Sequence, residues 1–256
     1  MMAKLSVFII TYNEERILDK CLNKLSWVDE IVVVDSGSTD ATLDICKKYH
    51  VKVFHNDFQG FGAQKQFALE KTSNDWVLSL DADEILSNEL IDEIKEVLIE
   101  NTYIAGYFIN RQHVFLDKVF NYGQDSKKCV LRLFKKSKGK FDGKMVHETI
   151  VVNGNTGNLK NSFLHFTARS LEHYLEKINT YATIFAEGQY LKNKKYSILE
   201  IALKVKLEFL KKYFLNLNIL NGKEGFYWSF LAAYSSGLKY IKTNEQYKKV
   251  KKQLMF

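Results

Sequence analysis

The stretch Trp76-Val77-Leu78-Ser79-Leu80-Asp81-Ala82-Asp83-Glu84 joins a strand-length apolar run to three carboxylates within four residues. Neither a buried strand nor an amphipathic helix places carboxylates in this way for packing. The carboxyl end of a strand in an open α/β sheet is where ligands bind, and Asp81 and Asp83 can both turn toward one point there. Such oxygen donors suit a divalent cation that also holds phosphates. The alternative is a solvated turn before a helix that Ser87 caps.

Apolar runs alternate with helix-length segments through the first hundred residues. We expect strands at 5–10, 31–34, 51–54 and 76–80, and helices at 14–25, from Ser38 or Thr39 to 49, at 60–71 and at 89–98. This alternation is typical of βαβ units and a mainly parallel sheet. Because parallel strands end along one edge, we expect the polar segments 11–14, 35–38 and 81–83 to converge on one crevice.

The sequence lacks the glycine-rich phosphate loops of two common nucleotide-binding folds. No Gly-x-Gly-x-x-Gly follows the first strand, and no Gly-x-x-x-x-Gly-Lys-Ser/Thr occurs anywhere. This excludes a dinucleotide fingerprint and a P-loop. The phosphates of a bound nucleotide would need another partner, and a metal held by Asp83 is the natural one.

Composition indicates a folded protein of 256 residues, with 46% hydrophobic and 14% aromatic residues. Cys21, Cys46 and Cys129 are odd in number and widely spaced, which fits a reducing cytoplasm better than disulfides or zinc. No signal peptide is readable, and no segment approaches the roughly 20 apolar residues of a membrane span. We therefore expect a soluble or peripheral protein.

Charge is distributed unevenly along the chain. Residues 1–159 contain 20 Lys and Arg against 23 Asp and Glu, whereas residues 160–256 contain 17 against seven. We expect helices from Ser170, at 196–215 and at 225–242, with aromatic and apolar faces bordered by lysine. Such faces fit an anionic membrane surface. Packing against the N-terminal α/β region and binding of nucleic acid are the alternatives, but no known nucleic-acid-binding signature is visible.

Three motifs together resemble the inverting nucleotide-sugar glycosyltransferases of family 2, which have the GT-A fold. They are Ser6-Val7-Phe8-Ile9-Ile10-Thr11-Tyr12-Asn13-Glu14-Glu15, Ile31-Val32-Val33-Val34-Asp35-Ser36-Gly37-Ser38-Thr39-Asp40 and Leu80-Asp81-Ala82-Asp83-Glu84. The later segments Arg132-Leu133-Phe134 and Val146-His147-Glu148, with the Lys/Tyr-rich tail, are similar to the lipopolysaccharide core β-glucosyltransferase branch.

The resemblance implies an α/β GT-A domain, with helices on both faces of the sheet, at residues 1–165. Its donor half would be about 1–100 and its acceptor half about 101–165. Residues 166–256 would then be the basic helical extension, peripheral to the membrane.

By the same resemblance, the donor nucleotide is held at the ends of the predicted strands. The donor-binding set is Thr11, Tyr12, Asn13, Glu14, Asp35, Lys65, Asp81, Ala82 and Arg132. Asp35 would accept from the uracil or the ribose, unless it only shapes the turn before Ser-Gly-Ser. Lys65 would reach the phosphates, or would be a solvated helix lysine. Arg132 would face the phosphates, or would pair with Asp125 or Asp142.

The resemblance also implies a divalent cation, Mn²⁺ or Mg²⁺, bound by Asp83 with Asp81 nearby and His165 as a third ligand. The cation would stabilise charge on the departing UDP. The general base that activates the acceptor hydroxyl would be Glu148, oriented by His147, with Asp125 as the alternative. Glu148 is otherwise an exposed carboxylate at the start of a strand, and both histidines are otherwise core or hydrogen-bonded residues.

These roles predict a cytoplasmic, membrane-peripheral enzyme that transfers a hexose, with glucose as the expected sugar, from a UDP-sugar to a lipid-linked lipopolysaccharide core saccharide. Another cell-surface glycan or a protein is the alternative acceptor. A non-catalytic nucleotide-sugar-binding or nucleic-acid-binding protein is the alternative of another class, although we expect no nucleic-acid partner.

Overall fold

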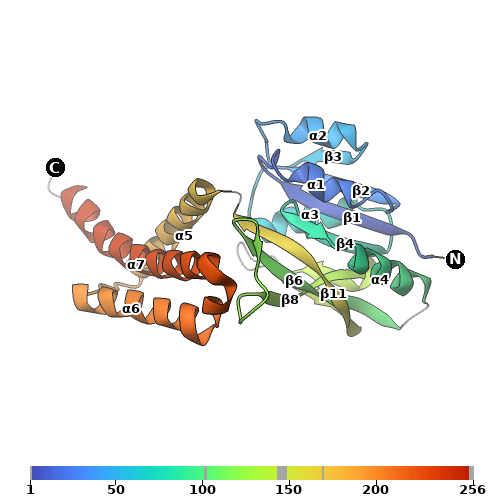
Figure 1. Cartoon of the computed structure of the whole chain (residues 1–256). Helices are drawn as coiled ribbons and strands as arrows, with labels where there is room; N and C mark the ends of the chain where they lie inside the picture. The colour runs from blue at the N-terminus through green and yellow to red at the C-terminus, as the bar shows by residue number, and fades with distance from the viewer. Residues whose placement is uncertain (1, 101–102, 143–148, 169, 254–256) are drawn as a thin grey trace. The chain divides into compact units, whose positions relative to one another are not determined.

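In the computed structural model of the chain, which describes residues 2–100, 103–142, 149–168 and 170–253, the residues form two compact units. The first contains Met1–Gln112 and Lys128–His165, and the second contains His113–Lys127 and Phe166–Phe256. Figure 1 shows strands and covering helices in the first unit and long helices in the second. Residues 113–127, expected in the acceptor half, pack instead with the C-terminal helices.

The first unit begins with alternating strands and helices. They are β1 (Leu5–Thr11), α1 (Leu18–Asn23), β2 (Glu30–Asp35), α2 (Thr42–Lys48), β3 (Lys52–His55), α3 (Phe61–Lys71), β4 (Trp76–Asp81), β5 (Glu84–Leu86) and α4 (Asn88–Ile99). The elements that follow are β6 (Ile104–Phe115), β7 (Lys118–Val119), β8 (Lys127–Lys135), the 3₁₀ turn η1 (Lys136–Lys138), β9 (Gly139–Phe141), β10 (Ile150–Val152) and β11 (Asn155–Ala168).

The main sheet has the strand order β3-β2-β1-β4-β8-β6-β11-β5, with β7 paired to β6. Strands β3, β2, β1 and β4 are parallel, as the βαβ pattern predicts. Strand β8 runs antiparallel to β4, and β5 antiparallel to β11. The α/β class is confirmed, and the antiparallel strands extend the parallel half.

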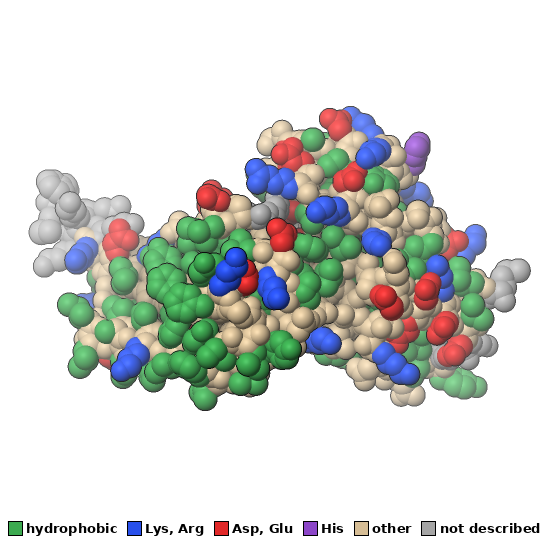
Figure 2. Space-filling model, in the orientation of Figure 1, with side chains coloured by type: hydrophobic (Ala, Val, Ile, Leu, Met, Phe, Trp, Pro, Cys, Tyr) green, Lys and Arg blue, Asp and Glu red, His purple; other side chains and the backbone are tan. Residues whose placement is uncertain are grey.

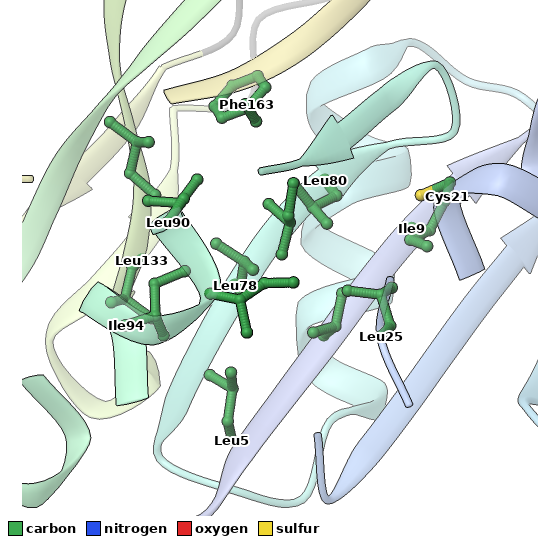
Figure 3. Close-up of a cluster of buried hydrophobic side chains, with 14 of the residues drawn as sticks. Leu5, Ile9, Cys21, Leu25, Leu78, Leu80, Leu90, Ile94, Leu133 and Phe163 are labelled. Carbon is green, nitrogen blue, oxygen red and sulfur yellow. The ribbon is translucent and has the colours of Figure 1, made fainter. Parts of the chain in front are cut away.

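Alternating side chains of the strands bury two apolar layers. Leu5 and Ile9 of β1 lie in the cluster shown in Figure 3, together with Cys21 of α1 and Leu90 of α4. Phe8 points to the opposite face, where a second cluster includes residues of α3. Because a strand places successive side chains on opposite faces, a nearly continuous apolar strand predicts helices on both faces, and the structure confirms them.

Two helix starts differ from the prediction. The helix expected from residue 14 begins at Leu18, because the backbone of 13–15 is tied to the loop after β2 instead. Helix α2 begins at Thr42 without a side-chain cap, so the predicted cap by Ser38 or Thr39 is wrong. The cap of α4 is confirmed, since the Leu90 N–H donates to Ser87 Oγ at 3.1 Å.

The second unit contains the helices expected in the basic tail. They are α5 (Leu171–Leu191), α6 (Ile198–Leu210), the π-helical turn η2 (Lys211–Leu215), the 3₁₀ turn η3 (Asn218–Asn221) and α7 (Gly222–Gln253). Helices α5 and α6 both pack on α7. The core combines Phe115, Phe120, Tyr174 and Trp228, and this aromatic cluster fixes residues 113–127 to the helices. Among the described residues, no helix is both long and apolar enough to cross a bilayer.

Candidate active site

The ends of three parallel strands meet at one edge of the sheet. Thr11 of β1 is in register with Asp35 of β2, and Ile10 of β1 is in register with Asp81 of β4. The three polar segments predicted to converge therefore do so, because the strands place them side by side.

Hydrogen bonds hold the first two of these segments together. Asn13 has a positive φ of 53°, its N–H donates to Ser38 Oγ at 2.8 Å, and its Oδ1 accepts from the Thr39 N–H at 2.8 Å. The Glu14 N–H donates to Thr42 Oγ1 at 2.7 Å. Asn tolerates the left-handed backbone better than most residues. Asn13 thus links the two loops through its own side chain.

Asp35 is buried and is used by its own turn. Its Oδ2 accepts from the backbone N–H groups of Gly37 and Ser38 at 2.8 and 2.9 Å, and its Oδ1 accepts from the Ser38 hydroxyl. The turn role that the sequence left open is therefore present. A carboxylate has about four lone-pair sites, so Oδ1 retains capacity for a further donor.

The remaining side chains of the first loop differ in exposure. Tyr12 is 58% exposed, whereas Thr11 is buried. Thr11 Oγ1 has no hydrogen-bond partner among the residues that the structure describes. A buried hydroxyl without a partner is costly, and a ligand at the strand ends is one way to satisfy it.

Asp81 is the centre of a charge cluster. Lys65, on α3, places its Nζ 2.7 Å from Asp81 Oδ1, and the Lys65 side chain is only 5% exposed. The alternative of a solvated helix lysine is therefore wrong. Lys65 lies beside the strand end because α3 covers that face of β1 and β2.

Arg132 joins the same cluster from β8. Leu133 of β8 pairs with Leu78 of β4, and because the two strands are antiparallel, Arg132 lies one step closer to the carboxyl end of β4. Its Nη2 is 2.8 Å from Asp81 Oδ2 and 2.5 Å from Glu84 Oε1. Arg132 therefore pairs with Asp81 and Glu84, and not with Asp125 or Asp142, which the sequence offered as alternative partners.

The charge cluster shifts the pKa values of Asp81 and Glu84 in opposite directions. Burial disfavours ionised Asp81, but Lys65 and Arg132 outweigh burial and lower the pKa of Asp81. Glu84 is fully buried, and burial raises its pKa to about 7, with Arg132 opposing and Asp81 and Asp83 adding to the rise. Asp81 therefore stays ionised, and Glu84 titrates near neutral pH.

Asp83 and His165 form the part of the site that fits a metal. Strand β11 places His165 in register with Glu84, and His165 Nε2 lies 3.5 Å from Asp83 Oδ2. A carboxylate and an imidazole are suitable ligands for Mn²⁺. Asp81 is already held by Lys65 and Arg132, and within the described ranges no group of three potential metal ligands is found. Further ligands would have to come from substrate phosphates or water.

Two residues of the site were not singled out from the sequence. Glu84 belongs to the acidic stretch, but only the fold shows that it bonds Arg132 and accepts from the Asp81 N–H at 3.0 Å. Gln64 is buried and donates to Ser36 Oγ and the Asn56 carbonyl, both at 2.9 Å. A glutamine on a helix gives no signal of such a role in the sequence.

The structure describes only one of the two candidate general bases. Glu148, with His147, lies outside the described residues. Asp125 belongs to the helical unit, where it accepts from Lys212 Nζ at 2.9 Å, Asn218 Nδ2 at 2.8 Å and Trp228 Nε1 at 3.2 Å. Burial opposes its ionisation, but these donors outweigh burial and lower the pKa of Asp125. Asp125 thus joins the segment 113–127 to the helices.

Known proteins resemble the chain over most of its length. The lipopolysaccharide core biosynthesis glycosyltransferase LpsC of Rhizobium meliloti (strain 1021) is 35% identical over 219 residues, covering 83% of this chain and 81% of LpsC. The uncharacterised glycosyltransferase RT0209 of Rickettsia typhi (strain ATCC VR-144 / Wilmington) is 32% identical over 258 residues, covering 95% and 88%.

A solved structure shares the fold. The crystal structure of residues 1–349 of S. aureus TarS in complex with UDP aligns with a TM-score of 0.50 at 18% identity, covering 96% of this chain and 91% of that one. Residues 6–164, which include every site residue described above except His165, match the family described as Glycosyl transferase family 2. The chain therefore belongs to glycosyl transferase family 2 and is a glycosyltransferase.

Proposed function

We propose that the protein transfers a hexose from a UDP-sugar to a saccharide of the lipopolysaccharide core, with inversion at the anomeric carbon. Glucose is the first sugar to test. The observation that carries the proposal is the cluster at the carboxyl end of β4. Asp81 is the last residue of β4 and Asp83 follows the strand, and Lys65, Arg132 and His165 reach them from three other elements.

The cluster is suited to a nucleoside diphosphate. Lys65 and Arg132 supply two positive charges beside the strand end, and Asp81 holds both side chains in place. Arg and Lys are the common partners of phosphate oxygens. Asp81 pairs with both cations, so a donor diphosphate would share these contacts or exchange with them. The TarS structure with UDP supports the nucleotide assignment.

The residues also fit a divalent cation, which we propose to be Mn²⁺ or Mg²⁺. Asp83 and His165 would hold it, and a bound cation would offset the charge that develops on the departing UDP. Thr11, Tyr12, Asn13, Glu14 and Asp35 would hold the uridine.

We propose Glu148 as the general base for the acceptor hydroxyl. The motif around Glu148 resembles the lipopolysaccharide core β-glucosyltransferase branch, whereas Asp125 already accepts hydrogen bonds from three donors of the helical unit.

The acceptor assignment is supported by the relative LpsC, which is named for lipopolysaccharide core biosynthesis. A lipid-linked acceptor places the reaction at a membrane surface, so we propose a cytoplasmic protein peripheral to the inner face of the membrane.

The donor site can be tested by thermal unfolding with Mn²⁺ and UDP-glucose, UDP-galactose, GDP-mannose or a CMP-sugar. A ligand at a hundredfold excess over its Kd stabilises the native state by about 2.7 kcal/mol. We expect one UDP-sugar to raise Tm in the presence of metal, and Asp83→Ala to abolish that rise. Asp92→Ala is the matched control, because Asp92 is a 73% exposed carboxylate on α4.

Two results would reject this donor proposal. The first is a wild-type Tm that no sugar nucleotide changes. The second is an Asp83→Ala protein that keeps the full metal-dependent rise. A rise with a UDP-sugar other than UDP-glucose would retain the site and correct the sugar.

A further inference from the structure

Exposed apolar side chains concentrate in one short part of the helical unit. Fourteen of the 29 large hydrophobic side chains exposed among the described residues lie between Ile198 and Tyr234. Figure 2 shows hydrophobic side chains gathered over the helical region. Monomeric soluble proteins rarely leave a large apolar patch uncovered unless it binds something.

Helix α6 is apolar on two opposite sides, and only one is covered. Val205 would be 2.8 Å from a Cβ placed on Gly237 of α7, and Phe209 packs edge-on against Phe226 of α7 at 5.7 Å between ring centroids. The helix has no buried residue. A helix that is hydrophobic around its circumference needs cover on both sides, so the second side lacks a partner in the described chain.

The uncovered side of α6 is a leucine stripe. Leu199, Leu203, Leu207 and Leu210 are 79%, 53%, 55% and 37% exposed. At 3.6 residues per turn these four side chains fall within an arc of about 80°. Lys206 lies about 20° beyond one edge of that arc, and it is exposed.

The segment after α6 exposes its leucines and buries its asparagines. Leu215, Leu217, Ile219 and Leu220 are 74%, 48%, 41% and 54% exposed, while Asn216, Asn218 and Asn221 are buried. This reverses the usual distribution of leucine and asparagine.

Hydrogen bonds explain how the segment holds this reversed arrangement. Asn218 Nδ2 donates to Asp125 Oδ2 at 2.8 Å and to the Lys212 carbonyl at 2.9 Å. Asn221 Nδ2 donates to the Tyr122 carbonyl at 3.0 Å, and Leu217 has a φ of 56°, which is unfavourable for leucine. The hydrogen bonds of the buried asparagines thus hold the segment in a strained backbone conformation that leaves the leucines exposed.

A groove extends the apolar surface between α6 and α7. It has a volume of about 430 Å³, and its lining includes Phe209, Leu210, Phe226, Phe230 and Tyr234.

The charge around this surface is positive. Residues 192–223 contain eight lysines, two glutamates and no aspartate. Four of the lysines have partners within the unit: Lys212 pairs with Asp125 and Lys223 with Glu224, while Lys204 and Lys195 lie over the Tyr240 and Tyr247 rings. The exposed ones are Lys192, Lys194, Lys195, Lys206, Lys211 and Lys223. A partner that covers the leucines must therefore also accept several positive charges.

We propose that the leucine stripe of α6, together with the outward side chains of residues 214–220, is a docking surface for an anionic lipid bilayer. Apolar side chains would enter the interfacial region, and the surrounding lysines would contact acidic headgroups. A second copy of this chain fits less well, because pairing two such surfaces would bring their lysines together. The inference does not depend on the transferase reaction.

The test is flotation of the full-length protein with vesicles of phosphatidylcholine, with and without phosphatidylglycerol. We expect binding to the vesicles with phosphatidylglycerol that weakens as salt is raised. Replacing two leucines, in Leu203→Gln/Leu207→Gln, should lower the partition coefficient by roughly tenfold or more. Lys206→Gln/Lys211→Gln should lower it roughly tenfold to thirtyfold, since each lysine near the surface contributes about 1 kcal/mol.

Matched controls come from the first unit. Ile99→Gln removes a 62% exposed isoleucine, and Lys138→Gln/Lys140→Gln removes two exposed lysines; both should bind like the wild type. If Leu203→Gln/Leu207→Gln does not fold, Leu215→Gln tests the same surface at a 74% exposed side chain.

Three results would overturn the proposal: no flotation of the wild type with anionic vesicles, unchanged flotation of the folded leucine variant, or a wild-type dimer in sedimentation that the leucine variant dissociates. The last would identify a second copy as the occupant. Flotation of a protein that binds no sugar nucleotide would support the docking surface and reject the donor proposal alone.

Discussion

Arg132 is the residue whose removal tests the charge cluster most directly. It contacts two carboxyls, Asp81 and Glu84, while its own side chain is 8% exposed and that of Glu84 is fully buried. Removing one partner of a buried ion pair costs about 3–5 kcal/mol. We expect Arg132→Met to cost about 3 kcal/mol, at the lower end of that range, because Lys65 remains beside Asp81 and Glu84 can take up a proton.

The proton on Glu84 gives the variant a characteristic pH dependence. In the wild type Glu84 titrates near pH 7. Without Arg132 its pKa rises further, so above pH 7 the folded variant retains a proton that the unfolded chain releases. Its free energy of unfolding should then fall relative to the wild type by up to about 1.4 kcal/mol per pH unit above 7. Below pH 7 Glu84 is protonated in both folded proteins, and the difference should level off.

Urea unfolding at pH 6 and pH 8 measures both effects. The double variant Arg132→Met/Glu84→Gln should lose the added pH dependence and be less destabilised than the sum of the single variants. Lys128→Met, an exposed lysine on the same strand β8, should stay within about 0.5 kcal/mol of the wild type. A cost for Arg132→Met below about 1 kcal/mol, or an equal cost at both pH values, would refute the assignment of a buried, titrating Glu84.

Two further predictions concern single carboxylates. Glu148→Gln should keep the rise in Tm with the UDP-sugar and lose glycosyl transfer, whereas loss of transfer with retained donor binding only in Asp125→Asn would identify Asp125 as the base. Glu30 is buried, and although burial raises the pKa, hydrogen bonds from Lys52, Ser6 and Ser73 lower it to about 2. Its stabilising effect is thus present above about pH 4.5 and is lost as the pH falls toward 2. Glu30→Gln should be less stable by up to about 3 kcal/mol at pH 7, and the difference should shrink in unfolding measurements at low pH.

The parallel half of the fold was predictable because its signals are local. Apolar runs such as 31–34 end in polar loops, and a parallel sheet must align those ends. The pairing of side chains there was not predictable, because Lys65, Asp81 and Arg132 are brought together only when α3 packs on β1 and β2 and β8 pairs with β4. The start of α1 at Leu18 was also missed, since the bonds of Asn13 and Glu14 to the loop after β2 override the local helix pattern.

The helical spacing of apolar residues correctly predicted lysine-rich helices in the basic part of the chain, but it did not identify which side of each helix is exposed. Helical periodicity cannot distinguish an apolar face that packs on a neighbour from one that remains exposed. On α6 the residues Val205 and Phe209 meet α7, and this contact assigns Leu203 and Leu207 to the surface. The buried asparagines at 216, 218 and 221 would be read from sequence alone as a solvated loop.

The proposed nucleotide site and the proposed docking surface have opposite chemical requirements, and together they suggest why one chain would carry both. Under the proposed function, the site in the first unit would hold a charged, water-soluble nucleotide beside the fixed charges of Lys65, Asp81 and Arg132. A lipid-linked acceptor remains in the bilayer and reaches an enzyme only at the membrane surface. An apolar stripe with flanking lysines would raise the local concentration of enzyme there without a spanning helix. Loss of the leucines should therefore lower transfer to a lipid-embedded acceptor more than transfer to its soluble saccharide. An equal loss on both acceptors would mean that the surface serves the catalytic unit in some way other than membrane docking.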